Sequence, residues 1–257
     1  MSIKFTILGC GSSLGVPRID GYFGSCNPKI KENFRTRCSA LISNQSYNIL
    51  IDTSPDIKSQ LLQNKISVIH KVFYTHMHGD QTHGINELRG FYLKNKKKID
   101  VYADKATTKY LLDSFKYCFN DGYGYPSILS LNKLKKKHIF ISNKNKITIE
   151  SIQVDHGKIK SILYKINNIC AYASDINKIN KKDINKIKNI KYLVIDCLRY
   201  IPHPSHYNLE DVLNLVELIK PKNTILTNLH SDIDYKRIKK ILPKNVKPAF
   251  DGMSFLI

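Results

Sequence analysis

The sequence lacks the features of a membrane protein or an exported protein. No apolar run approaches the roughly 18 consecutive residues that a membrane-spanning helix needs. The first residues enter a strand-like segment directly, without an apolar stretch followed by a small-residue cleavage site. These absences predict a soluble, cytoplasmic protein with no membrane partner.

The six cysteines include no C-x-x-C pair. This absence argues against a zinc ribbon and against a redox-active pair. Cys170 and Cys197 stand in apolar, strand-like runs, which predicts buried thiols. A disulfide framework is not expected in a chain without an export signal.

Acidic residues are scarce. The chain has 21 of them against 41 lysines and arginines, so its formal charge is +20. A basic surface could attract phosphates or RNA. However, the lysines are spread along the chain among isoleucines and asparagines, as in residues 176–193, and are not interleaved with aromatic residues. We therefore expect a solvated basic exterior, and a nucleic-acid partner is not favoured.

The length and the periodicity predict an α/β fold. The 257 residues suit one large α/β domain or two small ones. Strand-like runs cover residues 3–8, 38–43, 47–53, 70–75, 146–154, 161–166, 169–174, 191–198 and 223–229. Amphipathic helices are expected over 55–64, 106–119 and 208–220. Because each half opens with strands and then adds helices, we predict an αββα sandwich of two similar halves, one domain over residues 1–257.

A cluster of histidines follows the expected strand 70–75. In the histidine loop, residues 74–84, His76, His78 and Asp80 alternate along the chain. Two residues at an i, i+2 spacing at a strand end can point to the same side, and Gly79 permits a tight turn. Three potential ligands within five residues are hard to explain by core packing. The pattern predicts a metal site.

One loop cannot complete the coordination of a hydrolytic metal. Further candidates stand where other expected strands change from apolar to polar residues. They are His156, Asp175 and His230. Since strand ends meet at one edge of a sheet, these side chains could join the histidine loop.

The motifs resemble those of the metallo-β-lactamase superfamily. The match consists of THMHGD (75–80), IDTSPD upstream, and DHG, SD and TNLH downstream. Segments 8–18, 33–42 and 198–213 are similar to the phosphonate-operon phosphodiesterase group, whose members cleave cyclic phosphates and other phosphodiesters. The tRNA 3′-end-processing endonucleases are more distant relatives. The resemblance implies an αββα metallo-hydrolase.

The resemblance also implies roles for individual residues. His76, His78 and His156 would bind a first metal ion, Asp175 would bridge two ions, and Asp80 would bind the second. Asp52 would lie behind the histidine loop and fix its shape.

Two positions depart from the family pattern. Gln81 and Asn228 stand where the superfamily usually has histidines of the second metal. His230 is offset by two residues and could reach back along an extended strand, and His83 is a less certain replacement. Amide oxygens would shift the site toward manganese, magnesium or iron(II). We expect one firmly held divalent ion, zinc or manganese, and a second that is weakened by Gln81 and Asn228.

The resulting expectation is a metal-dependent phosphodiesterase acting on a small or cyclic phosphodiester. A hydroxide bridging two metal ions would attack phosphorus, with Asp80 orienting it. His206 would protonate the leaving oxygen, with His203 as a weaker candidate; alternatively, His206 caps the helix 208–220.

Arg199 and Arg18 could bind a phosphate oxygen. Three alternatives stay open: an RNA 3′-end nuclease, a thioester or lactone hydrolase on the same scaffold, and a binding protein without catalysis. The chain could form a homodimer.

Overall fold

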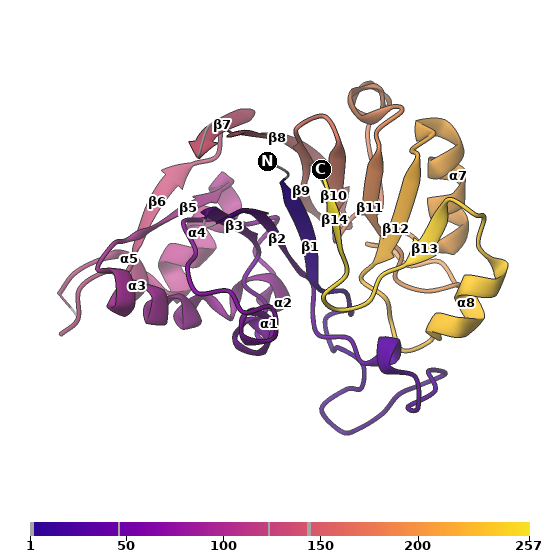
Figure 1. Ribbon diagram of the computed structural model, residues 1–257, viewed down its shortest axis with the longest axis horizontal. Helices are drawn as coiled ribbons and strands as arrows, with labels where there is room; N and C mark the ends of the chain where they lie inside the picture. Colours follow the sequence, from indigo (N-terminus) through magenta and orange to yellow (C-terminus); the bar gives the residue numbers. More distant parts are fainter. Residues whose placement is uncertain (1–2, 46, 123, 143–144) are drawn as a thin grey trace.

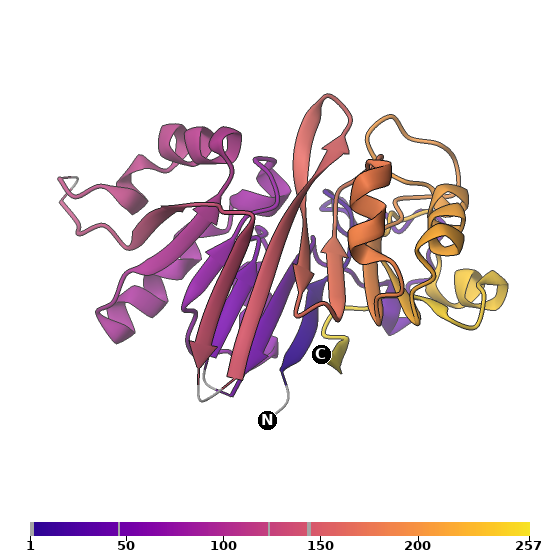
Figure 2. The ribbon, with the colours of Figure 1, turned by 90° about the horizontal axis from the view of Figure 1, so that it is seen from above.

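The structure, a computed structural model, describes residues 3–45, 47–122, 124–142 and 145–257. These residues form two seven-stranded sheets that pack face to face, with helices on the outside of each (Figures 1 and 2). The fold is therefore the predicted αββα sandwich. Within the described ranges, no helix is long and apolar enough to cross a bilayer.

The first sheet has the order β14-β1-β2-β3-β4-β5-β6. Its strands are β1 (Lys4–Gly9), β2 (Ser39–Asn44), β3 (Tyr47–Ile51), β4 (Lys71–Phe73), β5 (Ile99–Ala103), β6 (Leu129–Lys133) and β14 (Ser254–Leu256). Its helical segments are η1 (Lys31–Asn33), α1 (Ile57–Gln63), α2 (Gly79–Thr82), η2 (Ile85–Leu88), α3 (Arg89–Asn95), α4 (Lys105–Ser114) and α5 (Lys116–Phe119).

The second sheet has the order β13-β12-β11-β10-β9-β8-β7. Its strands are β7 (Lys137–Ser142), β8 (Asn145–His156), β9 (Ile159–Ile166), β10 (Cys170–Ala173), β11 (Tyr192–Asp196), β12 (Asn223–Thr227) and β13 (Val246–Pro248). It carries α6 (Lys181–Ile184), η3 (Asn185–Ile187), α7 (Leu209–Ile219) and α8 (Tyr235–Ile241). Each sheet passes from antiparallel pairs to parallel ones, so the two halves are similar, as predicted.

Side-chain alternation explains why both faces of each sheet are apolar. In β1, Phe5 and Ile7 point into the core between the sheets, whereas Leu8 joins the core under the helices of the first half. Around β4, Phe73 faces the other sheet and Val72 faces the helices. Strands covered on both faces read as continuous apolar runs, which is how they stand out in the sequence.

Several elements differ from the sequence-based expectation. The helix expected over 106–119 is two helices, because Phe115 leaves the helical region, with φ −130° and ψ 35°. The short strands β5, β6, β7, β13 and β14 were not predicted. The six cysteines are buried free thiols. The alternative that His206 caps the last long helix is wrong, since the side chain of Asn208 accepts from Asp211 N at 2.9 Å and caps α7.

Gly84 fixes the end of the histidine loop against the first sheet. Its N–H donates to Thr53 O at 2.9 Å. A Cβ at this position would lie 2.0 Å from the backbone oxygen of Ser54. Replacing Gly84 by Ala therefore forces the loop away from the sheet. We expect Gly84→Ala to lower the free energy of unfolding by about 2 kcal/mol or more in urea denaturation.

The matched control is Gly90 in α3, where an added Cβ would meet nothing within 4 Å. Gly90→Ala should raise the free energy of unfolding by up to ~1 kcal/mol, because alanine favours a helix. Equal effects of the two substitutions would contradict the close contact at Gly84.

Candidate metal centre and active site

The histidine loop is held by both sheets. Thr75 N and Oγ1 each donate to the carboxylate of Asp52 at 2.8 Å, and Asp52 is fully buried directly after β3. From the second sheet, Ile162 N donates to Thr75 O at 3.1 Å. Thr75 Oγ1 in turn lies 3.0 Å from Nδ1 of His76. Asp52 thus positions His76 through Thr75.

Three imidazoles converge at the rim of the two sheets. His76 Nε2 lies 3.0 Å from His78 Nδ1, which lies 3.3 Å from His156 Nε2. His156 Nδ1 lies 2.7 Å from the carbonyl oxygen of Ser205, so this nitrogen donates and Nε2 faces the other rings. Burial lowers the pKa of His76 to about 3 and also lowers the pKa of His78 and of His156. Neutral imidazole is the form that binds a metal ion.

Asp175 completes this ligand set. Its carboxylate, a ring nitrogen of His156 and a ring nitrogen of His206 lie within 4.8 Å of one another. Burial opposes a charge on Asp175, but the histidines that face it, His76 and then His206, lower its pKa below the ordinary value. The two groups, His76 with His78 and His156, and Asp175 with His156 and His206, share His156. Neutral imidazoles beside an ionised carboxylate are donors that suit zinc or manganese. These residues fit one divalent ion.

Gln81 lies between the two acids where the family pattern has a histidine. Its Nε2 donates to Asp80 Oδ2 at 3.2 Å and to Asp175 Oδ2 at 3.0 Å. Burial, followed by the charge of Asp175, raises the pKa of Asp80 to about 7. The neutral amide therefore supplies hydrogen-bond donors to both carboxylates on this side. Its Oε1 is buried and has no hydrogen-bond partner within the described part of the chain.

Asn228 points away from these carboxylates. Its Nδ2 donates to Asp196 Oδ1 at 3.1 Å, and Asp196 Oδ2 accepts from Nδ1 of His206 at 2.7 Å. Burial alone would lower the pKa of His206, but the charge and hydrogen bond of Asp196 raise it to about 9. Since Nδ1 is engaged by Asp196, Nε2 is left to face the pocket. His206 is therefore a protonated group beside the candidate metal ligands.

The structure does not bring the two substitute histidines to the metal position. A two-residue offset keeps the same face only in an extended strand, but β12 ends at Thr227 and Asn228 has a left-handed φ of 59°. His230 consequently turns toward Asp232, at 3.2 Å. His83 ends α2 and lies 2.8 Å from the hydroxyl of Tyr110. Neither belongs to the ligand groups found among the described residues.

The pocket at these residues, called the catalytic pocket below for its candidate role, has a volume of about 320 Å³. It is lined by residues of six segments: Ser12, Ser13, Leu14, His78, Asp80, His156, Asp175, Leu198, Arg199, His203, Ser205, His206, Asn228 and His230. Arg199 lines it as expected, with its Nη2 3.3 Å from Pro202 O. Arg18 does not; it lines a neighbouring groove and pairs with Asp20 at 2.5 Å. His203 lies beside His206, with ring centroids 5.0 Å apart.

The sequence analysis missed the partners of the histidines. Asp196, the partner of His206, is the main residue missed. The same sequence pattern that pointed to Asp175, an aspartate at the end of an apolar strand, could have identified it. No sequence pattern pointed to Thr75 or Ser205. Their contacts depend on the path of the backbone, which the spacing of residues along the sequence does not specify.

The architecture and the site together define an αββα metallo-hydrolase scaffold, with ligands contributed by strand ends. A family model described as a beta-lactamase superfamily domain matches residues 47–228. The chain belongs to the metallo-β-lactamase superfamily.

Among solved structures, the chain is similar to a diphosphatase of the PhnP family, with 25% identity, a TM-score of 0.88, and 98% of this chain and 97% of that chain covered. Human tRNase Z, short form, shares 14% identity at a TM-score of 0.69, covering 98% of each chain, which shows the fold alone. Among curated proteins, an octanoyltransferase of Porphyromonas gingivalis is 29% identical over 259 residues, covering 99% of this chain and 52% of that protein. The chain thus spans about half the length of this relative.

The contact between Asp196 and His206 generates a prediction for the metal-free protein. Replacing Asp196 by Asn removes the charge that contributes most to raising the pKa of His206, while burial, which lowers this pKa, and the charges of Asp175 and Asp80, which raise it, remain. In an NMR titration, the pKa of His206 should fall from about 9 toward the ordinary value near 6.5.

His70 is an internal control. Burial is the main cause that lowers its pKa, with contributions from Lys97 and Lys71, and His70 lies directly before β4 in the first sheet. Its titration should be the same in both proteins. A His206 pKa that stays near 9 in Asp196→Asn would contradict the assignment of Asp196 as the cause.

Proposed function

We propose that the chain is a metal-dependent phosphodiesterase that hydrolyses a small or cyclic phosphodiester. The observation that carries this proposal is that His206, held by Asp196 at 2.7 Å, lies beside the candidate metal ligands His156 and Asp175. A leaving alkoxide requires a proton, which His206 can donate. A thiolate leaves with far less need of one, since thiols have a pKa near 8.5. The similarity to a PhnP-family diphosphatase supports the same choice.

The residues have separate tasks in this reaction. A divalent ion, held by His76, His78, His156 and Asp175, would polarise the phosphoryl oxygen and acidify water. Asp80, with its raised pKa, can accept a hydrogen bond from the attacking water and take its proton. His206 Nε2 donates to the leaving oxygen, while Asp196 holds the ring in place through Nδ1.

Arg199 is placed to contact the phosphate. It lines the catalytic pocket, and its Nε is buried without a hydrogen-bond partner among the described residues. An unpaired buried donor of a guanidinium group favours an anionic ligand. A phosphate oxygen in the pocket would satisfy it.

We further propose that the site holds one ion firmly and a second only weakly. Gln81 donates to both carboxylates that a second ion would need, and Asn228 is bound to Asp196. A second ion must therefore displace the amide hydrogens of Gln81 and turn its Oε1 inward. The unpartnered Oε1 leaves that rotation available.

The phosphodiesterase proposal is tested with purified protein loaded with manganese or zinc. It should hydrolyse 2′,3′-cyclic nucleotides and bis-p-nitrophenyl phosphate, and an octanoyl thioester or a lactone at least about 100-fold more slowly. His206→Ala should lower kcat/KM for the cyclic nucleotide by about 10²–10⁴, the usual contribution of a general acid. The loss for bis-p-nitrophenyl phosphate should be much smaller, because p-nitrophenolate leaves without a proton.

Equal losses for both substrates would refute the acid role of His206. Inactivity toward every phosphodiester, or a preference for the thioester or lactone, would refute the phosphodiesterase itself.

The one-ion proposal is tested by manganese titration with calorimetry and EPR. The wild-type chain should bind one Mn²⁺ firmly, with a second at least about 100-fold weaker. The double variant Gln81→His, Asn228→His should bind two ions and show a spin-coupled EPR signal. Gln153→His, at an exposed position of β8, serves as the control and should behave as wild type. Two equally tight ions in the wild-type chain would contradict the proposal.

A further inference from the structure

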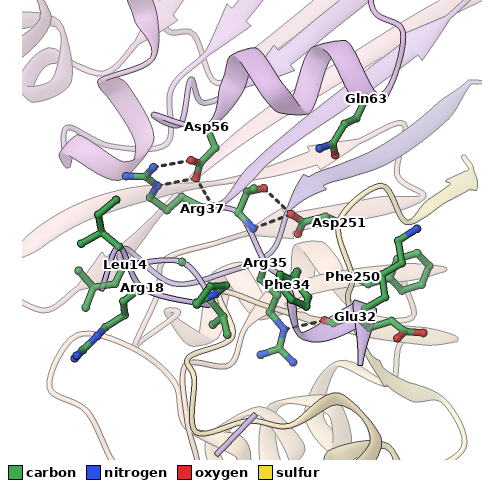
Figure 3. A pocket seen from close by; sticks show the side chains of 16 residues that line it. Leu14, Arg18, Glu32, Phe34, Arg35, Arg37, Asp56, Gln63, Phe250 and Asp251 are labelled. Carbon is green, nitrogen blue, oxygen red and sulfur yellow. Dashed lines mark hydrogen bonds and ion pairs between the residues drawn. The ribbon is translucent and has the colours of Figure 1, made fainter. Parts of the chain in front are cut away.

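A groove of about 950 Å³ shares one lining residue, Leu14, with the catalytic pocket. Figure 3 shows this groove. We call it the side groove. One wall is the segment 14–19, and the opposite wall contains Arg37, Asp56 and Gln63 at and near α1. Phe34 and Phe250 also line it. None of the candidate metal ligands or acid groups described above lines this groove.

The side groove adjoins the catalytic pocket. Leu14 lines both of them. Arg37, in the groove, is also close enough to Asp80 for their charges to interact: the hydrogen bond with Asp56 is the main cause that raises the pKa of Arg37, and the charge of Asp80 contributes. A substrate held at the metal site can therefore extend past Leu14 into the groove.

The volumes show why a substrate would extend there. Binding sites for small molecules usually enclose roughly 300–1,000 Å³. The catalytic pocket, at about 320 Å³, is at the lower limit and must already hold the reacting phosphate. The side groove, at about 950 Å³, supplies the space for the rest of a larger substrate.

The lining of the side groove combines exposed apolar groups with charges. Leu14, Ile19 and Phe34 are 58%, 106% and 49% exposed, three large apolar side chains at one groove. Exposed apolar side chains that gather in a concave site indicate a ligand. Arg18 adds a cation whose ion pair with Asp20 is solvent-exposed, so exchanging this partner for a ligand group loses little.

We propose that the side groove binds a nucleoside-like group attached to the reacting phosphate. A flat base offers Phe34 a face for stacking, and its polar edges and ribose can bond to the charged groups around it. A hydrocarbon chain fits less well, because it would remove charged side chains such as Arg18, Lys31 and Glu32 from water without bonding to them. This inference rests on the proposed phosphodiesterase function and defines its substrate class.

Three p-nitrophenyl phosphodiesters with the same leaving group test the inference. Their second ester group is methyl, thymidine 5′ or octyl. In the wild-type chain, kcat/KM should be about tenfold higher for the thymidine ester than for the methyl ester, because one stacked base contributes about this factor or more. Phe34→Ala and Arg18→Ala should each reduce this thymidine-to-methyl ratio, mainly through KM for the thymidine ester.

Leu218→Ala is the control, since Leu218 is 58% exposed like Leu14 but lies on α7. It should leave the ratio unchanged. Calorimetry with thymidine 5′-phosphate gives a second readout without catalysis, and both groove variants should bind it more weakly than the wild-type chain does.

Two results would overturn the side-groove proposal while leaving the phosphodiesterase intact. One is equal kcat/KM for the methyl and thymidine esters, or a ratio that the groove variants do not change. The other is a preference for the octyl ester, which would identify an apolar channel. If none of the three esters were hydrolysed, the phosphodiesterase function itself would fail, and this inference with it.

Discussion

The close approach of two carboxylates, the buried Asp175 and the half-buried Asp80, is the constraint on which the site depends. Asp80 and Asp175 cannot both hold a negative charge so close together unless cations or hydrogen-bond donors stabilise them. On one side the partners are imidazoles and the ion they can hold. On the other side the partner is the amide of Gln81, which donates to both acids. The nearby charge of Asp175 also contributes, after burial, to the raised pKa of Asp80.

The packing of the two sheets holds these charged groups in place. The ligands come from the ends of strands in both halves of the chain, and bonds between the sheets keep those ends together. Ile162 N reaches Thr75 O, and the Tyr164 hydroxyl donates to Tyr74 O at 2.5 Å. The apolar core between the sheets, which contains Phe73 and Tyr164, stabilises the same contact. Packing and chemistry therefore depend on the same few strand ends.

Much of this could be predicted from the sequence, because apolar runs and the polar residues that end them report on local structure. Continuous apolar strands indicated a sandwich, and the strand-end residues His156 and Asp175 do lie with His76 and His78. The expectation for His230 failed because one residue, Asn228, takes a left-handed conformation that interrupts the alternation. The groove location of Arg18 depends on the path of a long loop. Spacing along the chain carries no information about either.

The most direct test of the central claim is anomalous X-ray scattering from crystals grown with manganese. One strong peak should lie among His76, His78, His156 and Asp175, with Gln81 Nε2 still bonded to the Asp80 and Asp175 carboxylates. A second peak of equal height between Asp80 and Asp175, or no peak near the three histidines, would contradict the account.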